Sequence, residues 1–173
     1  MAVFLDTISE STPQLDKPYI IAEVGSNWLS EEPYLAIQHI IQAKECGCDA
    51  VKFQLFNSVE LYGYRVKALD QYALPQQWLG LLKEECDKHK IDFMCTAFSP
   101  EGLKLVDPLV RAHKIASSDM KYVQLLDAAE STGKPILWST GGATMNEIEQ
   151  MWRPEFIPME CVANYPAETK HYR

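Results

Sequence analysis

The chain has 173 residues, 47% of them hydrophobic, which suits one folded domain with a substantial core and excludes a disordered chain. Its net charge of −8 argues against a nucleic-acid-binding protein, because such proteins usually carry a basic face. Residues 1–14 lack the pattern of a secretion signal and no apolar run reaches membrane-spanning length, so we expect a cytoplasmic protein without nucleic-acid or membrane partners. The five cysteines show no metal-binding spacing and are interpreted as buried free thiols.

Strands and helices are expected to alternate along the chain. After a polar lead-in at residues 1–17, strands are predicted at residues 19–24, 50–56, 91–96, 112–117, 135–139 and 158–163. Helices are predicted between them, beginning at Pro33, Pro75, Pro100, Val123 and Thr144. The connection over residues 57–73 is expected to be irregular, as a surface loop packed by its own aromatic residues or as a place for substrate contacts. Such alternation predicts a parallel sheet.

Polar side chains recur at the carboxyl ends of the predicted strands. They are Glu23, Ser26, Asn27, Lys52, Gln54, Thr96, Lys114, Ser117, Ser139, Thr140, Asn164 and Tyr165. A (β/α) barrel would bring these ends together on one face, whereas a doubly wound sheet would gather fewer of them. The absence of a Gly-x-Gly-x-x-Gly motif after the first strand disfavours a dinucleotide-binding fold. We therefore predict an α/β fold over residues 18–173, a partial TIM-type (β/α) barrel of about six βα units.

Lys52 lies within an apolar run that is typical of a strand buried on both faces. A charge in such a position is costly unless it is paired or meets a charged ligand. One interpretation places Lys52 at the mouth of the strand in an ion pair with a carboxylate such as Glu23. Lys114 repeats the pattern on a second predicted strand, and two such lysines favour a site for an anion.

Seven segments at the strand ends match, in order and spacing, a known group of enzymes. They are Ile21–Asn27, Asp49–Gln54, Cys95–Phe98, His113–Asp119, Gly133–Pro135, Ser139–Gly141 and Cys161–Pro166. Together they resemble the N-acetylneuraminate (sialic acid) synthase family, over roughly residues 18–167. The resemblance implies a TIM barrel that condenses phosphoenolpyruvate with N-acetylmannosamine or a related N-acetylated sugar. In that reaction C3 of phosphoenolpyruvate attacks the sugar aldehyde, with a divalent metal, manganese or magnesium.

The same resemblance implies roles for individual residues. Lys52, Thr96, Lys114, Ser117 and Ser139 would hold the carboxylate and phosphate of phosphoenolpyruvate. This role suits their chemistry, since ammonium and hydroxyl groups are donors for a trianionic ligand. Glu23 would handle protons near the reacting centre, and Tyr165 would contact the sugar. The Asn or Ser with which the family contacts phosphoenolpyruvate aligns with Ala163 here, and the adjacent Asn164 is the candidate for that contact. Ser117 and Ser139 have an alternative role as caps of the helices that follow.

Several positions depart from the family pattern. Trp28 stands where the family typically has a histidine, and Glu160 stands where a histidine is common. The two metal-binding histidines, the last two strands and the C-terminal antifreeze-like domain of the family are not found in residues 1–173. We therefore expect a homo-oligomer or a separate complementary chain. Three readings remain open, namely a synthase active with a partner, a non-catalytic relative that binds an anionic metabolite or a protein, and a Schiff-base aldolase using Lys52 or Lys114.

Overall fold

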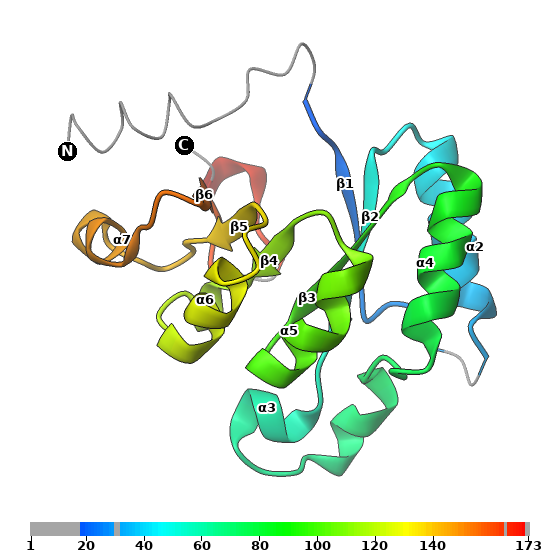
Figure 1. Ribbon diagram of the computed structural model, residues 1–173, viewed down its shortest axis with the longest axis horizontal. Helices are drawn as coiled ribbons and strands as arrows, with labels where there is room; N and C mark the ends of the chain where they lie inside the picture. The colour runs from blue at the N-terminus through cyan, green and yellow to red at the C-terminus, as the bar shows by residue number, and fades with distance from the viewer. Residues whose placement is uncertain (1–17, 30–31, 165, 172–173) are drawn as a thin grey trace.

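The structure is a computed structural model that describes residues 18–29, 32–164 and 166–171. These residues form β1 Ile21–Gly25, β2 Ala50–Leu55, β3 Asp92–Ala97, β4 His113–Ile115, β5 Ile136–Ser139 and β6 Phe156–Met159. The strands make two three-stranded sheets, ordered β1-β2-β3 and β4-β5-β6, in which every pair is parallel. The two sheets meet where β3 lies beside β4 (Figure 1). The predicted order of six parallel strands is confirmed for the described residues.

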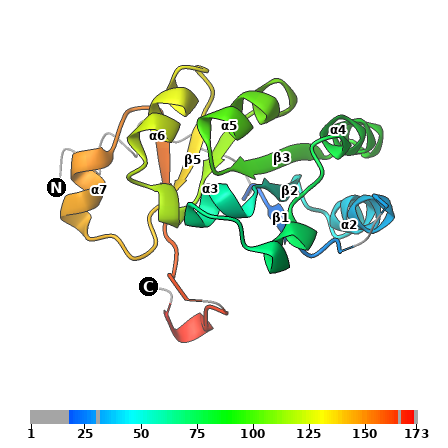
Figure 2. The ribbon, with the colours of Figure 1, turned by 90° about the horizontal axis from the view of Figure 1, so that it is seen from below.

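Among the described residues, five helices cover the outer side of the strands, and a sixth, α3 Ser58–Tyr62, lies beyond the end of β2 (Figures 1 and 2). The five are α2 Tyr34–Glu45, α4 Trp78–His89, α5 Pro100–Val106, α6 Val123–Glu130 and α7 Met145–Met151. Figure 2 shows α2, α4, α5, α6 and α7 around the outside of the strands, as in part of a barrel. The fold is therefore the partial (β/α) barrel that the sequence predicts.

Helix α2 illustrates how the sequence sets these elements. Pro33 precedes its first residue, and Gly47 follows its end with φ of 82°, a left-handed conformation that glycine adopts readily. Its buried residues Ala36, Ile40 and Ala43 recur at helical spacing, so they form one face against the sheet. Each large aliphatic side chain buried in this way contributes about 1.5–3 kcal/mol.

The prediction of an irregular connection over residues 57–73 is wrong in part. Residues 58–62 form α3, and residues 67–72 form a 3-10 helix. The cause is a capping box in which the Asn57 side chain accepts a hydrogen bond from the Glu60 amide, and the Glu60 carboxylate accepts one from the Asn57 amide. Two aromatic residues of this segment, Tyr62 and Tyr64, do lie against one another, with ring centroids 6.4 Å apart.

Strand β6 begins and ends earlier than the predicted range of residues 158–163. Phe156 is fully buried against Trp138 of β5, with ring centroids 5.4 Å apart, and this packing places the strand at residues 156–159. Similarly, α4 begins at Trp78 rather than at Pro75. The predicted lead-in at residues 1–17 lies outside the described residues. Within the described ranges no helix is long and apolar enough to cross a membrane.

Candidate functional site

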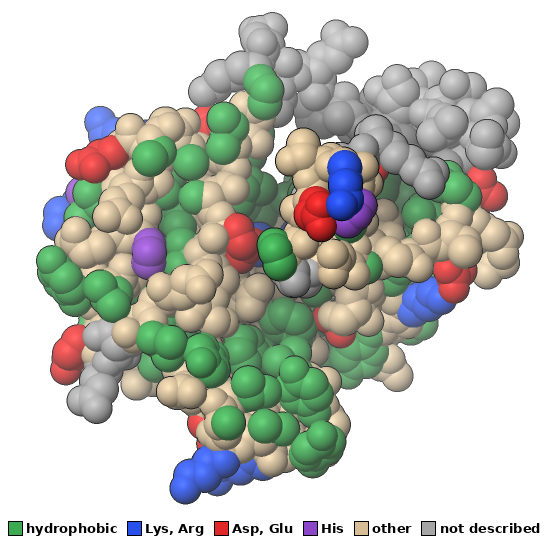
Figure 3. Space-filling model, turned by 180° about the vertical axis from the view of Figure 1, so that it is seen from behind, with side chains coloured by type: hydrophobic (Ala, Val, Ile, Leu, Met, Phe, Trp, Pro, Cys, Tyr) green, Lys and Arg blue, Asp and Glu red, His purple; other side chains and the backbone are tan. Residues whose placement is uncertain are grey.

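A cavity of about 680 Å³ lies where the carboxyl ends of both sheets meet. Its lining comprises Ile21, Glu23, Lys52, Gln54, Thr96, Phe98, Lys114, Ala116, Ser117, Ser118, Ser139, Gly141, Met159, Cys161, Val162 and Ala163. One part of this wall is cationic and rich in hydroxyl groups, and the other part is apolar. On the face shown in Figure 3 the Lys and Arg side chains are scattered, whereas Lys52 and Lys114 both belong to the cavity lining.

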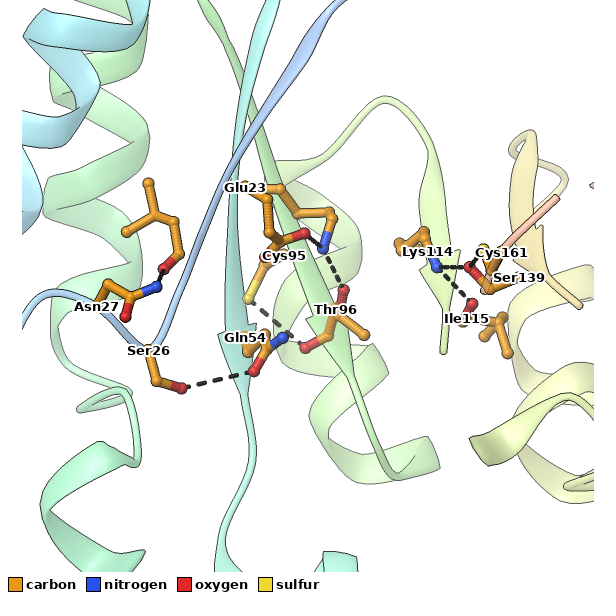
Figure 4. Close-up of polar contacts among 12 residues, drawn as sticks. Glu23, Ser26, Asn27, Gln54, Cys95, Thr96, Lys114, Ile115, Ser139 and Cys161 are labelled. Carbon is orange, nitrogen blue, oxygen red and sulfur yellow. Dashed lines mark hydrogen bonds and ion pairs between the residues drawn. The ribbon is translucent and has the colours of Figure 1, made fainter. Parts of the chain in front are cut away.

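In the β1–β3 half, Lys52 is almost fully buried and paired with a carboxylate. Its ammonium group forms an ion pair with Glu23 and donates a hydrogen bond to Thr96 Oγ1 at 3.1 Å. The Lys52 residue is 6% exposed, whereas the Glu23 side chain is 50% exposed and reaches solvent. The pairing follows from the sheet, because Glu23 lies opposite Lys52 in the β1–β2 ladder just before a break in register at Gly25. In Figure 4 the side chains of Glu23 and Thr96 converge, and both contact the Lys52 ammonium group. The ion pair with Glu23, which was one of the two interpretations of Lys52, is therefore present, and the anion-site interpretation stays a prediction.

In the β4–β6 half, Lys114 is held by neutral acceptors. Its ammonium group donates to the carbonyl oxygen of Ile115 at 2.7 Å and to Ser139 Oγ at 2.5 Å (Figure 4). The thiol of Cys161 also donates to Ser139 Oγ, with a distance of 3.3 Å between the two atoms. Burial, followed by the positive charge of Lys52, lowers the pKa of Lys114 from 10.5 to about 8. A negatively charged ligand would favour the protonated form of this lysine.

Most of the residues that the sequence singled out come together in this cavity. Glu23, Lys52, Thr96, Lys114, Ser117 and Ser139 all line it. Asn164 is exposed, and its amide donates to the carbonyl oxygen of Pro166 at 3.4 Å, while the neighbouring Ala163 is the residue at the cavity wall. Tyr165 lies outside the described residues. The proposed roles of all eight residues stay predictions.

Sequence reasoning did not assign three polar contributors to the wall. Gln54 was noticed as a polar strand residue but received no role, and its Oε1 accepts a hydrogen bond from Ser26 at 3.5 Å. The sequence predicts Cys161 as a buried free thiol, but the residue is only partly buried at the cavity wall. Gly141 has no side chain from which a role could be predicted. The tight approach of Gly141 to its neighbours depends on three strand ends, so only the folded chain reveals it.

A divalent metal is implied by the family resemblance, but the residues of this cavity do not fit one. Among the residues that the structure describes, no group of three or more His, Cys, Asp or Glu side chains is arranged to hold a metal ion. Glu23, the acidic residue in the cavity lining, already pairs with Lys52. We therefore derive no metal-dependent step from these residues.

Parallel strands, outer helices and a polar cavity at the carboxyl ends of the strands define a protein of the (β/α) barrel class. Within that class the chain belongs to the NeuB family, whose sequence pattern matches residues 39–173. This finding confirms the predicted relationship to sialic acid synthases.

Individual relatives agree with this assignment. The spore coat polysaccharide biosynthesis protein SpsE of Bacillus subtilis is 30% identical over 99% of this chain and 51% of its own length. The N-acetylneuraminate-9-phosphate synthase of Drosophila melanogaster is 29% identical over 90% of this chain and 48% of its own. A crystal structure of the N-acetylneuraminic acid synthetase of Leptospira borgpetersenii, in complex with citrate, superposes with a TM-score of 0.82 at 31% identity, covering 92% of this chain and 58% of that one. The chain thus spans about half the length of the curated relatives it matches.

Proposed function

We propose that this chain binds phosphoenolpyruvate between Lys52 and Lys114 and takes part in its condensation with N-acetylmannosamine or a related sugar aldehyde, yielding a nonulosonic acid. The observation that carries this proposal is the convergence of two lysines from separate sheets in one cavity with the hydroxyl groups of Thr96, Ser117 and Ser139. Ammonium and hydroxyl donors suit a ligand with one carboxylate and one phosphate. The Leptospira relative was crystallised with citrate, which, like phosphoenolpyruvate, is a small anion with several negative charges.

Calorimetric titration with phosphoenolpyruvate tests the anion site directly. A double variant, Lys52→Met with Lys114→Met, keeps much of the side-chain volume and removes both charges, so it should show no measurable binding. Lys104→Met is the matched control, because Lys104 is exposed on α5 and does not contribute to the cavity wall. Equal binding by the wild type and the double variant would rule out the proposed site. Circular dichroism and thermal unfolding of each variant establish that the fold is retained.

The condensation itself is proposed to need a second chain or a second copy of this one. In the described part, β1 pairs with β2 and β6 pairs with β5, which leaves an outer edge on each strand. Exposed strand edges favour association with another chain. Light scattering at micromolar concentrations should therefore show an oligomer, and a monodisperse monomer would contradict self-association. Synthesis of a nonulosonic acid only after a complementary chain is added would support the split-site proposal.

Binding and turnover should differ in their metal requirement. Since no metal-binding cluster is found among the described residues, phosphoenolpyruvate should bind equally well to the isolated chain with manganese or with EDTA. Where the added chain supplies metal ligands, the complemented protein should condense the substrates with manganese or magnesium and lose activity in EDTA, because Lewis-acid activation of an aldehyde is worth several kcal/mol. Anion binding without turnover in every combination tested would favour a non-catalytic relative.

A Schiff-base aldolase is the second candidate, and the state of Lys114 is the observation that favours it. Burial and the nearby Lys52 charge lower its pKa to about 8, which makes more of the nucleophilic amine available at neutral pH. The amine would add to the ketone of pyruvate and lose water to form an imine. Borohydride in the presence of pyruvate should then leave a stable adduct on the Lys114 peptide by mass spectrometry. An unmodified Lys114 peptide would exclude this activity and leave the condensation proposal intact.

A further inference from the structure

The turn that follows β5 places a glycine against two other strand ends. The Gly141 amide donates a hydrogen bond to Ser117 Oγ at 3.0 Å, and both residues line the cavity. The turn itself is anchored, since the amide and hydroxyl of Thr140 both donate to the carbonyl oxygen of Met159 at 3.2 and 2.9 Å. Gly141 therefore joins the ends of β4, β5 and β6 at one point.

There is no room for a side chain at this point. A Cβ atom on Gly141 would lie 2.9 Å from Ser117 Oγ, 3.1 Å from the Cβ of Cys161 and 3.2 Å from the carbonyl oxygen of Cys161. Non-bonded carbon contacts are favourable at roughly 3.5–4.0 Å, so these approaches are repulsive. The carbonyl oxygen belongs to the backbone and cannot easily move away from an added methyl group. The hydroxyl of Ser117 can rotate, so it is the group that a methyl would displace first.

The hydrogen bond also settles the direction of the Ser117 hydroxyl. A backbone amide can only donate, so Ser117 Oγ accepts from Gly141 and its own hydrogen must point elsewhere. Ser139 is in the same situation, because its oxygen accepts a hydrogen bond from the ammonium group of Lys114, which can only donate. Both hydroxyl groups are thus free to donate their hydrogens, and both line the cavity.

We propose that Gly141 is a positioning residue for the anion site. It holds the Ser117 hydroxyl as a donor toward the ligand, and its lack of a side chain keeps that hydroxyl and Cys161 in place. This inference rests on the proposed binding of phosphoenolpyruvate. In this role Gly141 acts through Ser117 and does not itself contact the reacting atoms.

The test is a double-mutant cycle on phosphoenolpyruvate affinity, with the wild type, Gly141→Ala, Ser117→Ala and the double variant. A hydrogen bond to a charged group is worth about 1.5–3 kcal/mol, so each single variant should bind roughly tenfold or more weakly. The double variant should bind about as weakly as either single one, because the methyl acts by displacing a hydroxyl that is already absent. Wild-type affinity in Gly141→Ala, or losses that multiply in the double variant, would overturn the inference.

Gly80→Ala is the matched control. Gly80 lies in α4, and a Cβ built on it would meet nothing within 4 Å. Its substitution should leave anion affinity unchanged and stabilise the helix slightly, because alanine favours a helix by about 1 kcal/mol over glycine. A parallel loss of affinity in Gly80→Ala would show that the effect at Gly141 is not specific, which would also overturn the inference.

A second measurement keeps the inference testable if Gly141→Ala fails to fold. Amide hydrogen exchange at Gly141 should be faster in Ser117→Ala than in the wild type, since the acceptor is gone. Equal exchange rates would overturn the proposed hydrogen bond and the role built on it. Failure of the proposed function has a different signature, namely a wild type that shows the protected Gly141 amide but binds no phosphoenolpyruvate.

Discussion

The two halves of the cavity each hold a lysine in different surroundings, with Lys52 buried and Lys114 partly buried. Lys52, in the β1–β3 half, has its charge offset by the carboxylate of Glu23. Lys114, in the β4–β6 half, is held by a carbonyl oxygen and a hydroxyl, and its pKa is lowered to about 8. The first lysine is largely neutralised before any ligand arrives, and the second is not. Lys114 should therefore contribute more than Lys52 to the attraction for an anion.

The largest expected effect separates the two lysines. Lys114→Met should weaken phosphoenolpyruvate binding about a hundredfold, in the range for truncating a buried charge that meets an opposite charge. Lys52→Met should cost only about tenfold, because the variant loses a positive charge but Glu23 was already offsetting it. Calorimetry measures both affinities. A greater loss in Lys52→Met would show that the Glu23 carboxylate moves away from Lys52 when the ligand binds.

Glu23→Gln should increase the affinity for phosphoenolpyruvate, in contrast to the two lysine substitutions. The glutamine keeps the shape of the side chain and removes the negative charge beside Lys52, so phosphoenolpyruvate should bind about fivefold more tightly. In this background Lys52→Met should become as damaging as Lys114→Met. Because Glu23 is half exposed, the gain should shrink as salt is added. Weaker binding by Glu23→Gln would indicate that Glu23 itself holds the ligand.

The lowered pKa of Lys114 predicts two opposite responses to pH. The folded protein binds fewer protons than the unfolded chain between about pH 8 and pH 10.5, so stability should rise with pH in this window. The destabilising cost of the buried charge is fully present below the folded pKa and is removed above the unfolded value. Affinity for an anion should fall over the same window, because the neutral amine attracts it less.

Both responses are measured as differences between the wild type and Lys114→Met. Urea unfolding at about pH 7 and about pH 9.5 gives the change in stability, and titration with phosphoenolpyruvate at the same two values gives the change in affinity. Taking the difference removes the contribution of other groups that affect stability in this range. One is Cys95, whose thiol titrates near pH 9 in the unfolded chain, whereas burial raises its pKa to about 12 in the folded protein. Identical pH profiles for the two proteins would contradict the assignment to Lys114.

The smallest effect is expected at Cys161, whose thiol is a weak donor to Ser139. Cys161→Ser keeps a donor at this position and should bind phosphoenolpyruvate within about twofold of the wild type. Cys161→Ala removes the donor and leaves the Ser139 hydroxyl less well oriented, so a loss of about threefold is expected. A much larger loss in either variant would place Cys161 among the groups that contact the ligand.

Much of the fold could be predicted because its signals are local. Apolar runs and helix-start residues such as Pro33 and Thr144 can be recognised within short segments of sequence. The structure has the predicted strands and helices in the predicted order. The errors came from local signals that were missed or weak. The Asn57–Glu60 capping box forms a helix in the expected loop, and β6 starts early because its first residue, Phe156, packs on Trp138 of the neighbouring strand β5.

The positively charged residues of the candidate site could be predicted from the sequence, but several other lining residues could not. A charged residue in a buried strand is conspicuous in any sequence, so Lys52 and Lys114 were found. Ala163 and Asn164 are adjacent, and only the path of the chain after β6 decides that Ala163 lines the cavity. Gly141 carries no functional group, so its importance depends on how closely three strand ends approach one another.

By itself the sequence determined the alternation of strands and helices, the membership of the NeuB family and the presence of two lysines within apolar strands. The tertiary structure decided which groups surround each lysine. Glu23 is 29 residues from Lys52 in the chain, and Ser139 is 25 residues from Lys114, yet each pair is in direct contact. Electrostatic interaction and desolvation depend on distance and burial in space, so the difference between the two lysines exists only in the folded protein.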